Sequence, residues 1–168
     1  MFPQISNFEI IHAIREKYDP AVEKIGPHVT LVFPFESNIG TQELREHLIS
    51  ALSGFKPFEV TLSGITGDAL FEKFLFLNVG KGKKEIRAMH EKLYTGILEK
   101  YRPVWLRDGA FLPHMTVGKI EDKEQFEEAV EETRNITDCF ATTITAVSVE
   151  IIEENGDSTI EMEIPLNQ

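Results

Sequence analysis

The stretch PHVTL, residues 27–31, decides the fold of this chain, because a close copy, PHMTV, recurs at residues 113–117. The copies begin 86 residues apart in a chain of 168 residues. Each is followed by a helix-like segment and then by an alternating strand that begins with phenylalanine, Phe58 or Phe140. We interpret this as one supersecondary unit present twice. It predicts a single bilobal domain over residues 1–168, with one copy in each half and a pseudo-twofold axis between them.

The polar residues of the two copies are expected to face one groove. Side chains alternate between the two faces of a strand, so His28 and Thr30 share one face and His114 and Thr116 share another. The apolar residues between them suit packing beneath helices. A single His-x-Thr strand would be ordinary, and it is the repeat that favours a functional pair. The sequence therefore predicts two histidines and two threonines directed into a shared cleft.

The rest of the chain mixes helix and strand without strict alternation, which favours an α+β fold. We expect antiparallel sheets lining a central groove, with helices on the outer faces. An Asn155-Gly156 turn predicts a closing hairpin. Helices are expected at residues 6–18, 41–52, 84–101 and 122–133, and strands at residues 27–35, 58–65, 74–79, 114–117, 140–152 and 158–164.

Composition limits the classes of partner. Hydrophobic residues make up 42% of the chain, enough for a sizeable core, and the net charge is −11. Because non-specific nucleic-acid binding rests on many Lys and Arg contacts to phosphates, no long nucleic acid is expected as a partner. Cys139 is the single cysteine, so neither an internal disulfide nor a cysteine metal cluster can form. There is no apolar run of about 18 residues and no signal-peptide pattern, which predicts a cytoplasmic protein without a membrane partner. Nothing in the sequence indicates the oligomeric state.

At the paired His-x-Thr motifs the chain resembles the two-histidine (2H) phosphoesterase superfamily, which includes 2'-5' RNA ligases and cyclic phosphodiesterases. The stretches at residues 15–20 and 27–35 are similar to an uncharacterised bacterial branch of that superfamily. Members usually open with a clear first strand, for which only residues 1–5 are available here. The resemblance implies opening of a 2',3'-cyclic phosphate or a related cyclic ester, or the reverse ligation, on a small nucleotide or an RNA end. No cofactor is expected.

The residue types fit that chemistry. Histidine has an ordinary pKa of about 6.5, so it can both accept and donate a proton near neutral pH. His28 and His114 are therefore the candidate catalytic residues, and which of them is the base is left open. Thr30 and Thr116 are candidate donors to the phosphate oxygens. No metal is expected, since two histidines alone make an incomplete metal site.

Three alternatives remain open: a nucleotide or RNA-end binding module without turnover, a metal-dependent hydrolase that uses the two histidines as ligands, and a purely structural duplication. Turnover by alanine variants and sensitivity to chelation separate them.

Other residues are less informative. The remaining histidines, His12, His47 and His90, fall in predicted helices and are expected at the surface or at the edges where helices pack. A few side chains could stack a base or bind phosphate on the groove walls, although a core or surface position is the simpler interpretation of each: Phe33, Phe35, Tyr101, Trp105 and Arg107.

Overall fold

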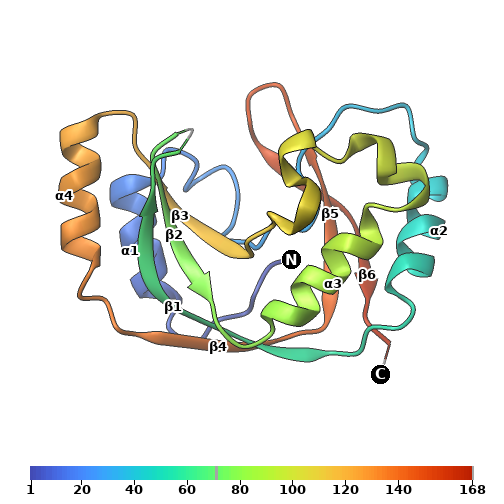
Figure 1. Ribbon diagram of the computed structural model, residues 1–168, viewed down its shortest axis with the longest axis horizontal. Helices are drawn as coiled ribbons and strands as arrows, with labels where there is room; N and C mark the ends of the chain where they lie inside the picture. The colour runs from blue at the N-terminus through green and yellow to red at the C-terminus, as the bar shows by residue number, and fades with distance from the viewer. Residues whose placement is uncertain (71, 168) are drawn as a thin grey trace.

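Two antiparallel sheets form the body of the protein, and the longer one curls around one end of it (Figure 1). The computed structural model describes residues 1–70 and 72–167, without the side chains of residues 107 and 108. The larger sheet has the order β3-β2-β1-β4, and β5 pairs with β6 in the smaller one. The strands are β1 (Phe58–Asp68), β2 (Phe74–Val79), β3 (His114–Lys119), β4 (Cys139–Ile144), β5 (Ala146–Ile152) and β6 (Ser158–Pro165).

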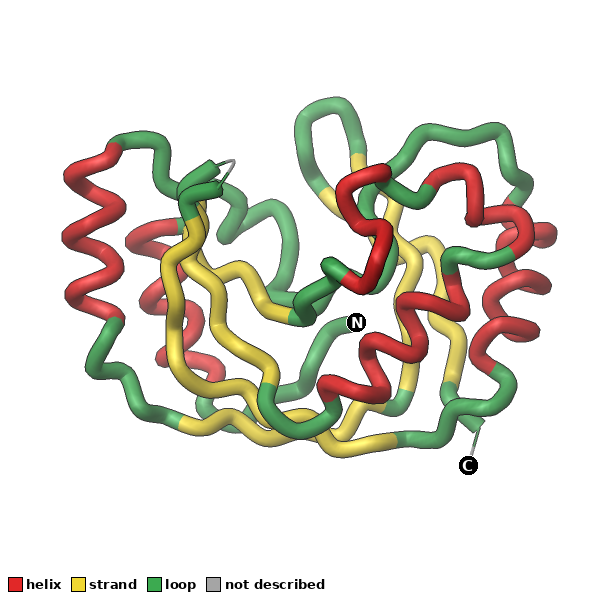
Figure 2. Tube along the Cα trace, in the orientation of Figure 1, coloured by secondary structure: helices red, strands yellow, loops and turns green. Residues whose placement is uncertain are grey.

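Helices cover the outer sides of both sheets (Figures 1 and 2). Helices α1 and α4 pack against the larger sheet through β3 and β1, whereas α2 contacts α3 and β6 at the other end. This confirms an α+β fold with helices outside antiparallel sheets. The helices are α1 (Phe8–Tyr18), α2 (Thr41–Leu52), α3 (Lys83–Leu93) and α4 (Lys123–Thr133), with 3-10 helices at Gly96–Tyr101 and Val104–Gly109.

The elements differ from the sequence prediction in three places. Residues 27–35 form no regular strand, and only Val29 makes a β-bridge, to Met115. The helix expected to reach residue 101 ends at Leu93, because Tyr94 leaves the helical conformation and Thr95 is extended (φ −114°, ψ 170°). The chain then continues as a 3-10 helix that begins at Gly96, which has a positive φ of 54°. The strand expected at residues 140–152 is divided at Thr145, so that its halves join different sheets.

Other local predictions are confirmed. The β5–β6 hairpin turns at Asn155-Gly156, where Gly156 has a φ of 84° that suits a residue without a side chain. The helix expected to begin at residue 122 is α4, and Asp122 caps it by accepting a hydrogen bond from the Gln125 backbone N–H.

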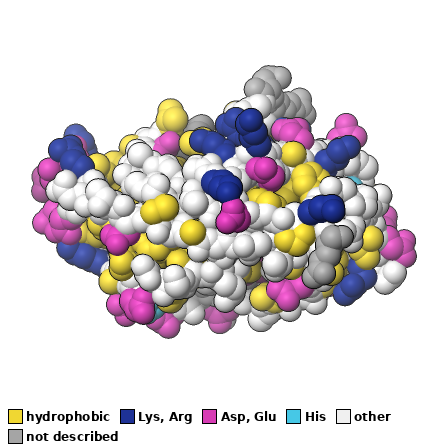
Figure 3. Space-filling model, turned by 90° about the horizontal axis from the view of Figure 1, so that it is seen from below, with side chains coloured by type: hydrophobic (Ala, Val, Ile, Leu, Met, Phe, Trp, Pro, Cys, Tyr) yellow, Lys and Arg dark blue, Asp and Glu magenta, His cyan; other side chains and the backbone are white. Residues whose placement is uncertain are grey.

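Charges of both signs are interspersed on the face shown in Figure 3, with no wide patch of Lys and Arg. Among the described residues, no helix combines the length and the apolar character needed to cross a bilayer.

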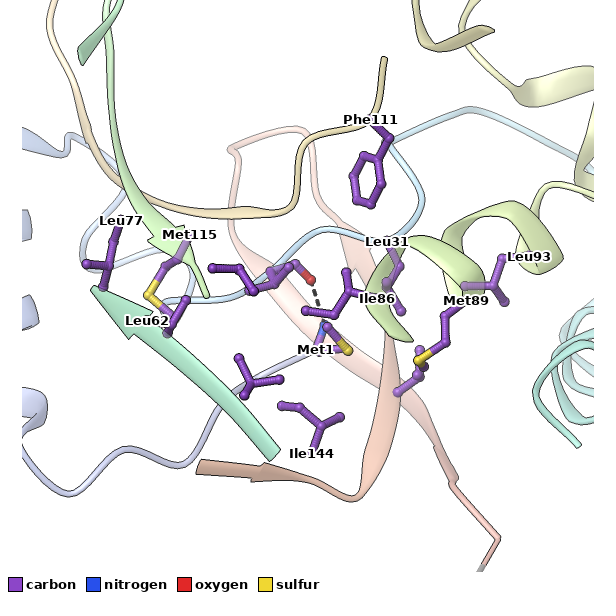
Figure 4. Packing of buried hydrophobic residues seen from close by; sticks show 14 of the residues in the cluster. Met1, Leu31, Leu62, Leu77, Ile86, Met89, Leu93, Phe111, Met115 and Ile144 are labelled. Atoms are coloured by element: carbon purple, nitrogen blue, oxygen red, sulfur yellow. Dashed lines mark hydrogen bonds between the residues drawn. The ribbon is translucent and has the colours of Figure 1, made fainter. Parts of the chain in front are cut away.

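The hydrophobic core joins the larger sheet to α3 (Figure 4). Leu62, Leu77 and Met115 contribute from the sheet, and Ile86 and Met89 from α3, and each is at most 1% exposed. Burying side chains of this size contributes about 1.5–3 kcal/mol each. This shared core fixes α3 against the strand that carries the second motif.

Candidate functional site

The two His-x-Thr motifs lie side by side. Val29, in the middle of the first, makes an antiparallel bridge to Met115, in the middle of the second. Both side chains are fully buried, with no exposed surface. Because successive side chains alternate in direction, the residues on either side of this bridge point away from the core.

The register of the bridge places each histidine beside the threonine of the other motif. In an antiparallel pair that joins residues 29 and 115, His28 lies opposite Thr116 and Thr30 lies opposite His114. The two histidines are then diagonal neighbours, a relation that separates residues by about 7–8 Å. A positive charge on His28 lowers the pKa of His114, which agrees with their closeness. The structure therefore brings all four predicted residues together.

Both imidazoles are held by the same kind of hydrogen bond. Nδ1 of His28 lies 2.9 Å from the carbonyl oxygen of Gly26, and Nδ1 of His114 lies 2.8 Å from that of Leu112. A carbonyl oxygen can only accept, so Nδ1 carries the hydrogen in each ring. Nε2 is then the basic nitrogen of the neutral ring, and neither Nε2 has a hydrogen-bond partner among the described residues.

Both histidines favour the neutral state. Removal from water by burial lowers the pKa of His28 and of His114 below 6.5, and the hydrogen bonds to the carbonyl oxygens offset part of this effect. Nearby carboxylates also raise the pKa values, Glu150 that of His28 and Asp68 that of His114. At pH 7 the free site therefore holds two neutral bases.

The two carboxylates were not predicted from the sequence. Asp68 ends β1, and Glu150 lies on β5 and accepts a hydrogen bond from the hydroxyl of Ser158. Each lies far along the chain from the histidine that it affects, and only the tertiary fold brings them near. No sequence pattern marked them.

An aromatic ring accompanies each histidine. The Phe76 ring, on β2, stacks on His114 with the centroids 3.7 Å apart and an interplanar angle of 25°. The Phe2 ring lies 5.7 Å from His28 at an angle of 48°. These rings exclude water from one side of each imidazole, which accounts for part of the desolvation. They were also missed in the sequence.

The N-terminal segment takes the place of the expected first strand. Residues 1–5 form no regular strand. The Met1 nitrogen nevertheless donates to the Val29 carbonyl at 3.1 Å, and the Val29 N–H donates to the Met1 carbonyl at 2.9 Å. This pairing carries Phe2 to the side of His28.

The threonines are half-buried, and their hydroxyl groups make no hydrogen bond to any described residue. Thr30 and Thr116 therefore keep a donor available to a bound anion.

Side chains of α3 and of Tyr94, the residue that follows it, hold the backbone of the first motif and of the residues after it. Nδ1 of His90 donates to the Leu31 carbonyl at 2.7 Å, and the hydroxyl of Tyr94 accepts the Phe33 N–H at 2.9 Å. The His90 ring also stacks on Phe111 with the centroids 3.7 Å apart and only 5° between the planes. One buried helix face thus contacts the segments that carry both motifs.

The expectation for His90 was therefore wrong. It is 0% exposed, because it follows Ile86 by one helical turn on the apolar face of α3. His12 pairs with Glu16 near the surface, and His47 is half-buried and hydrogen-bonded to the Leu93 carbonyl at 3.0 Å.

The aromatic candidates for the groove wall form their own contacts. Phe33 packs edge-on against Trp105 at 4.9 Å, and Phe35 stacks on Tyr101 at 4.4 Å. The side chain of Arg107 lies outside the described residues. Within the described chain, no three His, Cys, Asp or Glu side chains are grouped so as to hold a metal ion.

Comparison with known proteins identifies the family of the chain. The family model of the 2'-5' RNA ligase superfamily matches residues 2–156, so the chain belongs to that superfamily. It is 31% identical to a Bacillus licheniformis protein over 126 residues, which cover 74% of this chain and 71% of the relative. It is 29% identical to a Bacillus pumilus protein over 126 residues, which cover 74% of this chain and 70% of the relative. Both relatives carry the name "Putative phosphoesterase".

A solved structure shares the fold. The crystal structure of TT0787 of Thermus thermophilus matches with a TM-score of 0.58 and covers 95% of this chain and 92% of its own. Its sequence identity is 15%, so this likeness concerns the fold alone.

Proposed function

We propose that this protein is a metal-independent phosphoesterase that opens a 2',3'-cyclic phosphate, or a related cyclic phosphodiester of a nucleotide or an RNA end. One observation carries the proposal. His28 and His114 lie beside each other with matching Nδ1–H hydrogen bonds, and both Nε2 atoms remain unpartnered among the described residues. Superfamily membership and the names of the relatives support the same reaction class.

The two imidazoles divide the proton transfers. One neutral Nε2 removes the proton of an attacking water, and the other, protonated, donates to the leaving oxygen of the sugar. In-line displacement needs these oxygens on opposite sides of phosphorus, and a diagonal pair of rings suits that placement. General acid–base help of this kind is worth about 10²–10⁴-fold in rate. The hydroxyls of Thr30 and Thr116 donate to the non-bridging oxygens, where negative charge develops.

Binding of the substrate favours the protonation of one histidine, which the reaction needs. Both histidines have lowered pKa values in the free protein, so a proton must be taken up before one can act as the acid. An anion within about 4–6 Å favours the charged form of an imidazole. Binding of a phosphodiester therefore raises the histidine pKa values, and one ring becomes the acid while the other stays neutral.

The chain charge of −11 favours a small phosphate ester or a single RNA end over a long nucleic acid, because the protein surface repels an extended polyanion.

The test is turnover of a panel of 2',3'-cyclic nucleotides by the purified protein. His28→Ala and His114→Ala should each lower kcat by at least about 10²-fold, since each removes one proton-transfer group. His12→Ala is the matched control, because His12 lies near the surface on α1 and pairs with Glu16. Activity that survives chelation is expected.

Other results would replace the proposal. A wild-type protein that binds these nucleotides without turnover would be a binding module. Loss of activity on chelation, with recovery on adding a metal, would indicate a metal-dependent hydrolase. Unchanged activity in both alanine variants would leave the repeat with a structural role only.

A further inference from the structure

The internal repeat includes a pair of arginines outside the His-x-Thr motifs. A terminal nitrogen of Arg15, on α1, lies 2.7 Å from the Ile25 carbonyl oxygen. Nε of Arg87, on α3, lies 3.0 Å from the Phe111 carbonyl oxygen. Each of these carbonyls belongs to the residue three positions before a motif histidine. The helix that precedes each motif thus sends one arginine to the same backbone position.

The next carbonyl along the chain is the one that binds the histidine. Gly26 follows Ile25 and accepts from Nδ1 of His28, and Leu112 follows Phe111 and accepts from Nδ1 of His114. The peptide unit that the arginine holds is therefore directly joined to the residue that sets the tautomer of the ring.

A proline restrains the carbonyl that accepts from each histidine, because it follows Gly26 in one copy and Leu112 in the other. Pro27 and Pro113 stand between the accepting residue and the histidine. Proline has a fixed φ and restricts the residue before it to extended conformations. With the arginine on one side and the proline on the other, the accepting carbonyl has little freedom to turn away.

We propose that Arg15 and Arg87 are equivalent positioning residues, which keep the two imidazoles in the Nδ1–H tautomer with Nε2 directed at the phosphate. A ring in the other tautomer would carry its hydrogen on Nε2 and could not accept the proton of the attacking group. The effect on catalysis rests on the proposed phosphoesterase function, whereas the effect on the tautomer does not.

The two arginines differ in what else they hold. Arg15 is 2% exposed and is paired with the buried carboxylate of Asp19 at 2.8 Å. Removing it entirely would leave that carboxylate buried without its partner, which destabilises the fold. Arg87 is exposed, so its side chain can be changed with less effect on folding.

The test measures the tautomers directly, by the nitrogen-15 chemical shifts of the histidine side chains near pH 8, where rings with lowered pKa values are neutral. Arg87→Met keeps much of the apolar stem and removes the donors. The Nε2–H form should appear at His114 and not at His28. Arg15→Lys keeps a cation for Asp19 but has a shorter reach, and should affect His28 alone. Arg134→Met is the control, because Arg134 lies at the surface just after α4 and pairs there with Glu131.

Kinetics add a second measurement. Arg87→Met should lower kcat by about 10- to 100-fold, the effect expected of a misplaced catalytic group, with KM changed less than kcat. If the wild type turns over no cyclic nucleotide but Arg87→Met still changes the tautomer of His114, the phosphoesterase function is rejected and the positioning role stands. The positioning role is overturned if Arg87→Met leaves His114 as it is in the wild type, or if it changes both histidines equally.

Discussion

Replacing His90 by phenylalanine tests how α3 supports the first motif. The variant keeps a ring that can stack on Phe111, but it removes the donor that satisfies the Leu31 carbonyl. Leaving a buried acceptor without a partner costs about 1–3 kcal/mol. The same change removes Nε2 of His90, which is buried without a hydrogen-bond partner among the described residues, and this offsets part of the cost. Near pH 7.5 we therefore expect the variant to be less stable by about 1–2 kcal/mol.

The difference between the two proteins should depend on pH. Burial lowers the pKa of His90 in the folded protein, whereas the unfolded chain has the ordinary value of about 6.5. The stability associated with a neutral His90 is fully present above that value and is lost as the pH falls toward and through the folded pKa. The wild type should therefore lose up to about 1.4 kcal/mol more than the variant between about pH 7.5 and 5.5.

The measurement is urea unfolding of both proteins at a series of pH values in that range. Tyr94→Phe is the matched control, because it removes the acceptor of the Phe33 N–H and leaves His90 in place. It should be less stable than the wild type by a constant amount over the range, since burial raises the Tyr94 pKa and the phenol stays neutral. Parallel pH curves for the wild type and His90→Phe would refute the assignment of a buried neutral His90.

The packing and the site support three further predictions. Gly82→Ala should destabilise the protein by more than about 1 kcal/mol in urea unfolding, because Gly82 has a φ of 85° and the added Cβ would lie 2.8 Å from the Glu59 carbonyl oxygen. An unchanged stability would contradict this geometry. Leu62→Ala should cost about 2–5 kcal/mol in the same assay, since its side chain is 0% exposed, and a loss below about 1 kcal/mol would indicate a loosely packed core. The pH profile of kcat/KM should peak below about 6.5 and decline above it, because one of two histidines with lowered pKa values must be protonated; a maximum above about pH 7 would oppose the acid–base assignment.

Much of the site could be predicted because each copy of the repeat is a short, contiguous stretch of sequence. The copies at residues 27–31 and 113–117 show two histidines and two threonines at strand spacing, and the bridge between Val29 and Met115 places the two copies side by side. The order of helices and strands, mixed without strict alternation, predicted antiparallel sheets with helices outside. These inferences needed only the period of the side chains, the presence of a second copy and the order of the elements.

The support around the site could not be predicted in the same way. Residues 27–35 have the composition of a strand. The Leu31 carbonyl and the Phe33 N–H, however, are satisfied by His90 of α3 and by Tyr94, which follows α3, and not by a neighbouring strand. Whether side chains of a helix or a neighbouring strand satisfy these groups depends on tertiary packing, and the β-propensity of one segment does not predict this. The burial of His90 could have been predicted, because it lies one helical turn after Ile86 on the apolar face of α3.

The central claim is that two imidazoles share one phosphate. A crystal structure with a nucleoside 2'- or 3'-monophosphate, the product of opening a cyclic phosphate, tests it most directly. We predict a single phosphate group within hydrogen-bonding distance of Nε2 of both His28 and His114, with the hydroxyls of Thr30 and Thr116 on its other oxygens. A phosphate bound by only one of the rings, or at a separate surface, would contradict the claim.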